Sequence, residues 1–174
     1  MPRLVIVLAS LAVAVAASAT ASSTSAHTVN LATGQLDGHT ILGLTPSQVS
    51  AVLGKPDAAH GTKSRYVLQW GGGSPPHYEV IFTKHGASER AVTLALETGA
   101  YQDPKIGNIL KPTPAAFASL MQARYGRIYR ILKPLSHQPG GRSSGEFVQR
   151  SGSLHVSFGS RPNWGTFITL WQTG

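Results

Sequence analysis

The sequence predicts an α+β fold of two tandem repeats, each a helix followed by an antiparallel meander, which together form one extended sheet with the helices on one face. Three observations predict it. Two Thr-Pro pairs, at Thr45 and Thr113, each precede a helix-like segment. Each segment is followed by runs of alternating apolar and polar residues, which are typical of strands. A V-x-F sequence recurs late in each unit, from Val80 and from Val156, and indicates an internal repeat.

Residues 1–26 have the pattern of a secretory signal peptide. Arg3 gives a basic start, residues 4–16 are an apolar run, and small residues up to Ala26 supply cleavage sites. The apolar run is short for a membrane span, and an uncleaved N-terminal anchor is the alternative interpretation. We expect the protein to be secreted or periplasmic after cleavage, without a stable membrane span. Residues 27–37 are then expected to be a flexible lead-in.

The first repeat spans residues 38–100 and begins with a helix. Thr45 is a suitable N-cap, Pro46 fits the first helical position, and Gly54 can end the helix in a left-handed conformation. The strand-like runs that follow are residues 64–70, 77–84 and 91–98. The Gly- and Pro-rich stretch 71–76 predicts an irregular loop inside this meander.

Residues 101–112 lack the periodicity of a helix or a strand and are predicted to link the repeats. The second repeat spans residues 113–174, and its helix is expected to end at Gly126. Its strand-like runs are residues 127–133, 145–151, 153–160 and 165–174. A second Gly- and Pro-rich stretch, 136–145, predicts a loop at the place that matches the loop of the first repeat.

The helix that ends in V-x-x-x-L-G-K-P-D, between Val49 and Asp57, and the meander after it resemble the SmpA/OmlA domain. That family includes the small lipoprotein of the outer-membrane β-barrel assembly machine, and its G-[ML]-T-x-x-x-V-x-x-x-x-G core lies here between Gly43 and Gly54. The tandem arrangement behind an export signal resembles the fold of the secreted β-lactamase inhibitor protein. The second repeat keeps the Thr-Pro start but lacks the leading Gly and the Val. The chain has no Cys, so the lipidated Cys and the disulfides of these relatives are absent. The resemblance implies non-catalytic protein binding and names no target.

The charge is concentrated in the second repeat. The whole chain has a formal net charge of +8. Residues 27–100 hold five Lys or Arg and five Asp or Glu, whereas residues 101–174 hold nine Lys or Arg and two Asp or Glu. A solvated surface and a surface that meets an acidic partner are both consistent with this excess. If the partner is acidic, Arg127 and Arg130 are the first candidates to contact it.

Motifs for catalysis and cofactors are weak. The stretch 141–145, GRSSG, matches G-x-S-x-G, but a nucleophile elbow needs a strand before the motif and a helix after it. The seven His residues are scattered, without the spacing of a metal site. No phosphate loop or dinucleotide fingerprint is present. We therefore expect no cofactor, no metal and, in an exported protein, no nucleic-acid partner.

These observations favour an exported, non-enzymatic protein-binding module that acts on an envelope or secreted protein, like an inhibitor or an assembly factor. A small secreted serine hydrolase, with Ser143 or Ser144 and His155, is one alternative; a binder of anionic polymer through the basic second repeat is another. Trp70 and Trp164 are expected to be exposed, and His155 to point outward. The candidate protein-binding residues are Trp70, His77, Glu79, Arg127, Arg130, His155, Trp164 and Trp171.

Overall fold

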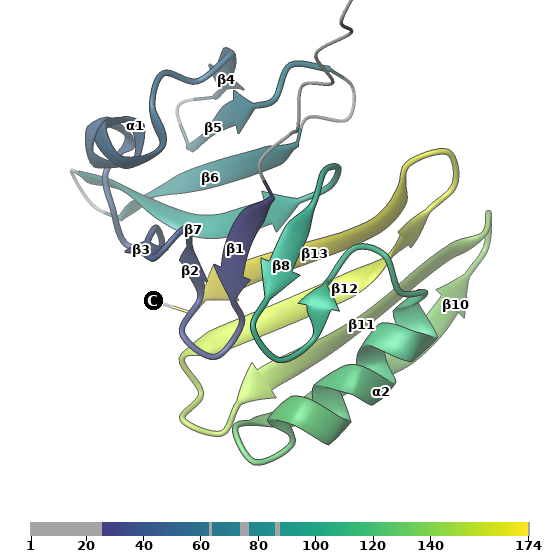
Figure 1. The fold of residues 1–174 in the computed structure, drawn as a ribbon. Helices are drawn as coiled ribbons and strands as arrows, with labels where there is room; N and C mark the ends of the chain where they lie inside the picture. The colour runs from purple at the N-terminus through teal and green to yellow at the C-terminus, as the bar shows by residue number, and fades with distance from the viewer. Residues whose placement is uncertain (1–25, 63, 74–76, 86–87, 174) are drawn as a thin grey trace, which may run out of the picture.

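The computed structural model describes residues 26–62, 64–73, 77–85 and 88–173 (Figure 1). Almost all of the expected signal peptide lies outside the described residues, as do the last three residues of the loop expected at 71–76. The expected α+β class is wrong. Of the described residues, 51% are in strands and 14% in helices, so this part of the protein is mostly β, and it forms two helices and two sheets.

The larger sheet has eight antiparallel strands in the order β10-β11-β12-β13-β7-β6-β5-β4. The four strands from the first half are β4 (Ala58–Gly61), β5 (Arg65–Trp70), β6 (Tyr78–His85) and β7 (Ser88–Leu96). The four from the second half are β10 (Tyr129–Gln138), β11 (Arg142–Gln149), β12 (Leu154–Arg161) and β13 (Gly165–Gln172). The two sets meet at the centre, where β13 pairs with β7 and Leu170 lies opposite Leu94.

The smaller sheet was not expected from the sequence. Its strands are β1 (His27–Asn30), β2 (Gln35–Leu36), β3 (His39–Thr40), β8 (Tyr101–Asp103) and β9 (Gly107–Asn108). It includes both the expected flexible lead-in and the expected linker, because β1 pairs in parallel with β8. Val29, Leu36 and Ile109 are fully buried. These two segments are therefore parts of the core, and the interpretation of them as a lead-in and a linker is wrong.

Two helices begin at the predicted Thr-Pro pairs. In α1 (Pro46–Leu53), the Thr45 hydroxyl accepts a hydrogen bond from the Gln48 backbone N–H, and the Gln48 side chain accepts one from the Thr45 N–H. Gly54 ends this helix with a φ of +82°, as predicted. In α2 (Pro114–Tyr125), Thr113 is the N-cap. The larger sheet is not covered by a layer of helices: α1 contacts β7, α2 contacts β10 to β12, and the smaller sheet lies between them (Figure 1).

Alternation along the strands gives the larger sheet a covered face and an open face. The covered face carries core residues of β5 to β7 and β10 to β13, among them Val80 and Val156, which are fully buried. The open face consists of the side chains that alternate with these and point away from α2 and the smaller sheet. Trp70 lies on the covered side, because it pairs with Tyr78 and stacks on its ring, and is only 5% exposed. The expectation that Trp70 is exposed is therefore wrong.

The loop expected at 136–145 is mostly strand. β10 continues to Gln138 and β11 begins at Arg142, so the turn between them is short. Gly145 and Gly159 belong to strands: a Cβ on Gly145 would lie 2.5 Å from the Phe158 ring, and one on Gly159 would lie 2.9 Å from the Phe167 ring. These glycines make room for aromatic rings and do not form turns.

Candidate functional site

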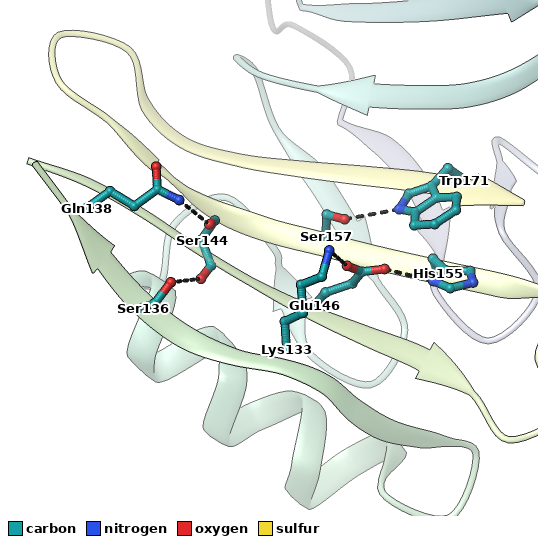
Figure 2. A network of polar contacts seen from close by, with 8 residues as sticks. All are labelled: Lys133, Ser136, Gln138, Ser144, Glu146, His155, Ser157 and Trp171. Atoms are coloured by element: carbon teal, nitrogen blue, oxygen red, sulfur yellow. Dashed lines mark hydrogen bonds and ion pairs between the residues drawn. The ribbon is translucent and has the colours of Figure 1, made fainter.

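A polar network on the open face joins three strands of the second half (Figure 2). The side chain of Glu146 on β11 is only 5% exposed, and its two carboxyl oxygens contact two different side chains. Oε1 lies 2.8 Å from Nδ1 of His155 on β12, and Oε2 lies 3.0 Å from Nζ of Lys133 on β10. A buried carboxylate needs such partners, because an unpaired buried charge is strongly destabilising. Glu146 is therefore held in one position.

An aromatic stack continues the network. The rings of His155 and Trp171 are cross-strand neighbours, 3.8 Å apart between centroids and tilted by only 21°. The Trp171 indole N–H donates to Oγ of Ser157 at 3.0 Å. His155 is on the open face, as expected, but this stack covers it, so it is 7% exposed and does not project outward. Trp171 is half-buried and presents part of its ring at this surface.

The serines do not form a catalytic arrangement with His155 in the part of the chain that the structure describes. Oγ of Ser143 lies 2.8 Å from Oγ of Ser160, on the covered side of the sheet. Oγ of Ser144 accepts a hydrogen bond from the Gln138 side chain. A nucleophilic Ser must lie within hydrogen-bond reach of its base, and neither Ser143 nor Ser144 bonds to His155. Both serines are in strand β11, which also removes the strand-to-helix turn that G-x-S-x-G requires.

A second group of polar side chains lies where the two halves of the sheet meet. Glu97, just after β7, is 8% exposed, and its Oε1 accepts a hydrogen bond from Nη1 of Arg161 at 3.2 Å. Its Oε2 is buried without a hydrogen-bond partner among the described residues. Burial raises the pKa of Glu97, while the Arg161 guanidinium opposes that rise. Nearby Glu79 contributes a smaller upward shift to the Glu97 pKa, and is itself hydrogen-bonded to Gln69.

The remaining candidate residues lie apart from this network. His77 is half-buried, and its backbone carbonyl accepts hydrogen bonds from Tyr101 Oη and from the Glu97 N–H. Arg127 and Arg130 are exposed beyond the C-terminus of α2 and at the start of β10. Arg127 lines a shallow cleft of about 410 Å³ with Arg124 and Lys105.

Trp164 is 43% exposed, as expected from the sequence, and lies in the turn between β12 and β13. Ten residues of β10 separate Arg127 from the turn that adjoins Trp164. At about 3.3 Å per residue this places them on the order of 30 Å apart. The structure therefore gathers His155 and Trp171 into one cluster, but it separates the basic candidates from the aromatic ones.

Sequence reasoning missed Glu146, Lys133 and Arg161, which fix the positions of the residues it did select. The missing signal was the strand register. Residues 145–151 were predicted as a strand, and alternation alone puts Glu146 on the face opposite Phe147. The pairing that places it beside Ser157 of the next strand could not be read from the sequence.

Comparison with models of protein families, with curated proteins and with solved structures found no match. In the described ranges, no three His, Cys, Asp or Glu side chains are grouped as ligands for a metal ion. Neither of the two helices described is long and apolar enough to cross a membrane.

Proposed function

We propose that this chain is an exported protein-binding module whose partner docks on the open face of the larger sheet, around Trp171. The observation that carries the proposal is the His155–Trp171 stack, fixed from below by Glu146 and Ser157. Trp residues are enriched among the side chains that dominate binding energies at protein interfaces. Here the ring is already held in place before any partner arrives.

Pre-organisation matters because ordering a side chain on binding costs about 0.5–1.5 kcal/mol. Two hydrogen bonds and one ring stack restrict His155 and Trp171, so little of this cost remains. The same face carries both signs of charge. Lys133 is 73% exposed on β10, and Glu79 is half-buried on β6. Charges of both signs at fixed positions favour one partner and one orientation over others.

This proposal differs from the two alternatives in what it requires. A serine hydrolase requires a hydroxyl next to His155, and a binder of anionic polymer requires a continuous basic groove. Neither is supported by the described side chains, because Ser143 and Ser144 bond elsewhere and Arg127 lies far from Arg161. Export, and the resemblance to the SmpA/OmlA domain, remain predictions from the sequence.

A photo-crosslinking experiment tests the proposed surface. A photoreactive amino acid is introduced at Thr169, which lies in the middle of the open face between Ser157 and Ala95, or at Ser119, which is exposed on α2. After incubation with the envelope and culture fluid of the source cells, we expect one protein to be captured from position 169 and not from position 119. In a pull-down of the same material without the photoreactive residue, Thr169→Arg should weaken recovery of that protein and Ser119→Arg should not. Equal capture from both positions would contradict a role for the open face.

A further inference from the structure

The ends of two hairpins form a cleft beside the open face. The turn between β10 and β11 and the turn between β12 and β13 lie side by side, since a Cβ on Gly141 would be 3.6 Å from Cγ of Pro162. The cleft between them has a volume of about 680 Å³. Its lining residues are Pro139, Gly140, Arg142, Arg161, Pro162, Asn163 and Trp164. Arg142 and Arg161 are cations, Trp164 supplies an exposed aromatic ring, and none of the lining residues carries a carboxyl group.

Arg161 is held in position by three contacts. Its Nη1 donates to Glu97, and its guanidinium lies 5.5 Å from the centroid of the Trp164 ring and 4.9 Å from that of Phe167. A guanidinium has five N–H donors, and only one is used in this hydrogen bond to a carboxylate. The other donors are available to a ligand that enters the cleft. Because Phe167 is on the open face, this Arg connects the cleft to the surface proposed for the partner.

Arg142 is exposed, and no carboxyl group of the described residues forms an ion pair with it. Glu97, which contacts this end of the sheet, already pairs with Arg161. The cleft therefore has an excess of positive charge. A planar carboxylate matches the fork of donors on a guanidinium, and the flat Trp164 ring offers an apolar wall next to it.

From this geometry we propose that the cleft binds an Asp or Glu side chain on an acidic segment of the partner protein, with an adjacent apolar or aromatic side chain against Trp164. This inference rests on the proposed function and specifies the partner's chemistry at one end of the interface. Arg and Trp are among the residues most enriched at the energetic centres of protein interfaces. A free phosphate would satisfy the two Arg residues but would leave the Trp164 ring without a contact.

The test uses the full chain and synthetic peptides, so it needs no natural partner. The peptide acetyl-Gly-Glu-Tyr-Glu-Gly-amide is titrated while the NMR signal of the Trp164 indole N–H is followed. A peptide with Gln in place of both Glu residues is the matched control ligand, because it has the same shape and no charge. We expect saturable shifts with the Glu peptide and a dissociation constant at least about tenfold weaker for the Gln peptide, since hydrogen bonds between charged groups are about twice as strong as neutral ones.

Variants separate the cleft from the general positive charge of the chain. Arg142→Gln should weaken the Glu peptide about tenfold, whereas Arg127→Gln, which removes the same charge at the far end of β10, should change the affinity less than about twofold. Arg161→Gln is made together with Glu97→Gln, so that no buried carboxyl group loses its cation, and should also weaken binding. Correct folding of each variant is checked by its NMR spectrum.

Four results would overturn the inference: no shift at millimolar peptide, equal binding of the Gln peptide, equal losses for Arg142→Gln and Arg127→Gln, or inorganic phosphate that binds as tightly as the peptide. The inference about the cleft and the proposed function of the open face can fail independently of each other. If a partner is captured from position 169 and Arg142→Gln does not weaken it, the open face is the interface and the cleft is not part of it.

Discussion

The two halves of the larger sheet begin with the same Thr-Pro signal but are covered in different ways. In the second half, α2 has twelve residues and buries Phe117, Met121 and Tyr125. In the first half, α1 has eight residues and buries only Val49. The smaller sheet contributes cover to both halves: Tyr101 of β8 bonds to the His77 carbonyl in the first half, and the turn between β1 and β2 accepts hydrogen bonds from Tyr129 and Gln149 in the second. The longer helix therefore buries more of its half-sheet, and the shorter one leaves more of the cover to other segments.

The largest expected effect is the loss of the whole fold at high pH, which tests whether the halves unfold together. Burial raises the pKa of Tyr78 from 10.0 to about 12, and it also raises the pKa of Tyr101, Tyr125 and Tyr129. A tyrosine with a higher pKa in the folded state stabilises the fold fully below pH 10, and this stabilisation is lost as the pH rises through the folded-state value.

Tyrosine absorbance and circular dichroism, recorded from pH 9 to 13, measure this loss. Tyr78 belongs to the first half of the larger sheet, Tyr101 to β8 of the smaller sheet, and Tyr125 and Tyr129 to α2 and β10 of the second half. We expect these four to ionise in one step that coincides with unfolding, because the core is shared. Two separate steps would show that the halves unfold independently.

Truncation of one buried side chain of each helix compares how much α1 and α2 contribute to covering the larger sheet. Phe117→Ala should lower the free energy of unfolding by about 3–5 kcal/mol, because Phe117 is fully buried and packs against the Phe158 ring. Val49→Ala removes fewer atoms from the buried face of α1 and should cost roughly 2 kcal/mol. Urea unfolding measures both changes. A larger loss for Val49→Ala would mean that α1 is the more important cover.

Asp103 connects the smaller sheet to α2, the two parts that cover the second half of the larger sheet, and its replacement tests that connection. The carboxyl group accepts hydrogen bonds from the backbone N–H of Leu31, at 3.1 Å, and from the Tyr125 hydroxyl, at 2.7 Å. It thus joins the smaller sheet to α2. Asp103→Ala leaves these buried donors unpaired and should cost about 3 kcal/mol. Asp37→Ala, whose hydrogen bonds are exposed, is the control and should cost less.

The sequence signals that succeeded were local ones. Thr45 caps its helix and Gly54 ends it with a positive φ, as predicted, since each feature depends on a few neighbouring residues. The smaller sheet could not be predicted in this way, because β2 and β3 have two residues each and show no periodicity. Its pairing of β1 with β8 depends on residues more than seventy positions apart.

Part of the candidate site was hidden for a different reason. Trp171 and His155 were recognised as candidates, but Glu146 was not, although it lies in the predicted strand 145–151, directly after the Gly- and Ser-rich stretch that was predicted to be a loop. Gly145 is required there by the nearby Phe158 ring, which is a tertiary contact. A glycine required for close packing and a glycine required for a turn look the same in one sequence. The polar network therefore became visible only with the strand register.

The smallest expected effect concerns Glu97, at the junction of the two halves. Its pKa is raised, mainly by burial, so the protonated carboxyl group suits the folded state better than the ionised one. The resulting stabilisation is present below the unfolded-state pKa and is lost as the pH rises through the folded-state pKa. Glu97→Gln keeps an oxygen that can accept the Arg161 hydrogen bond and removes the ionisation.

We therefore expect Glu97→Gln to change the free energy of unfolding little at pH 4 and to raise it, relative to the unmodified chain, at pH 8. Urea unfolding at both pH values measures the difference, and Glu89→Gln, outside this cluster, is the control for loss of a negative charge. A variant that is less stable than the unmodified chain at pH 8 would show that the ion pair with Arg161 outweighs the cost of burial. In that case the contact between Glu97 and Arg161 would be an electrostatic link that holds the two halves of the sheet together.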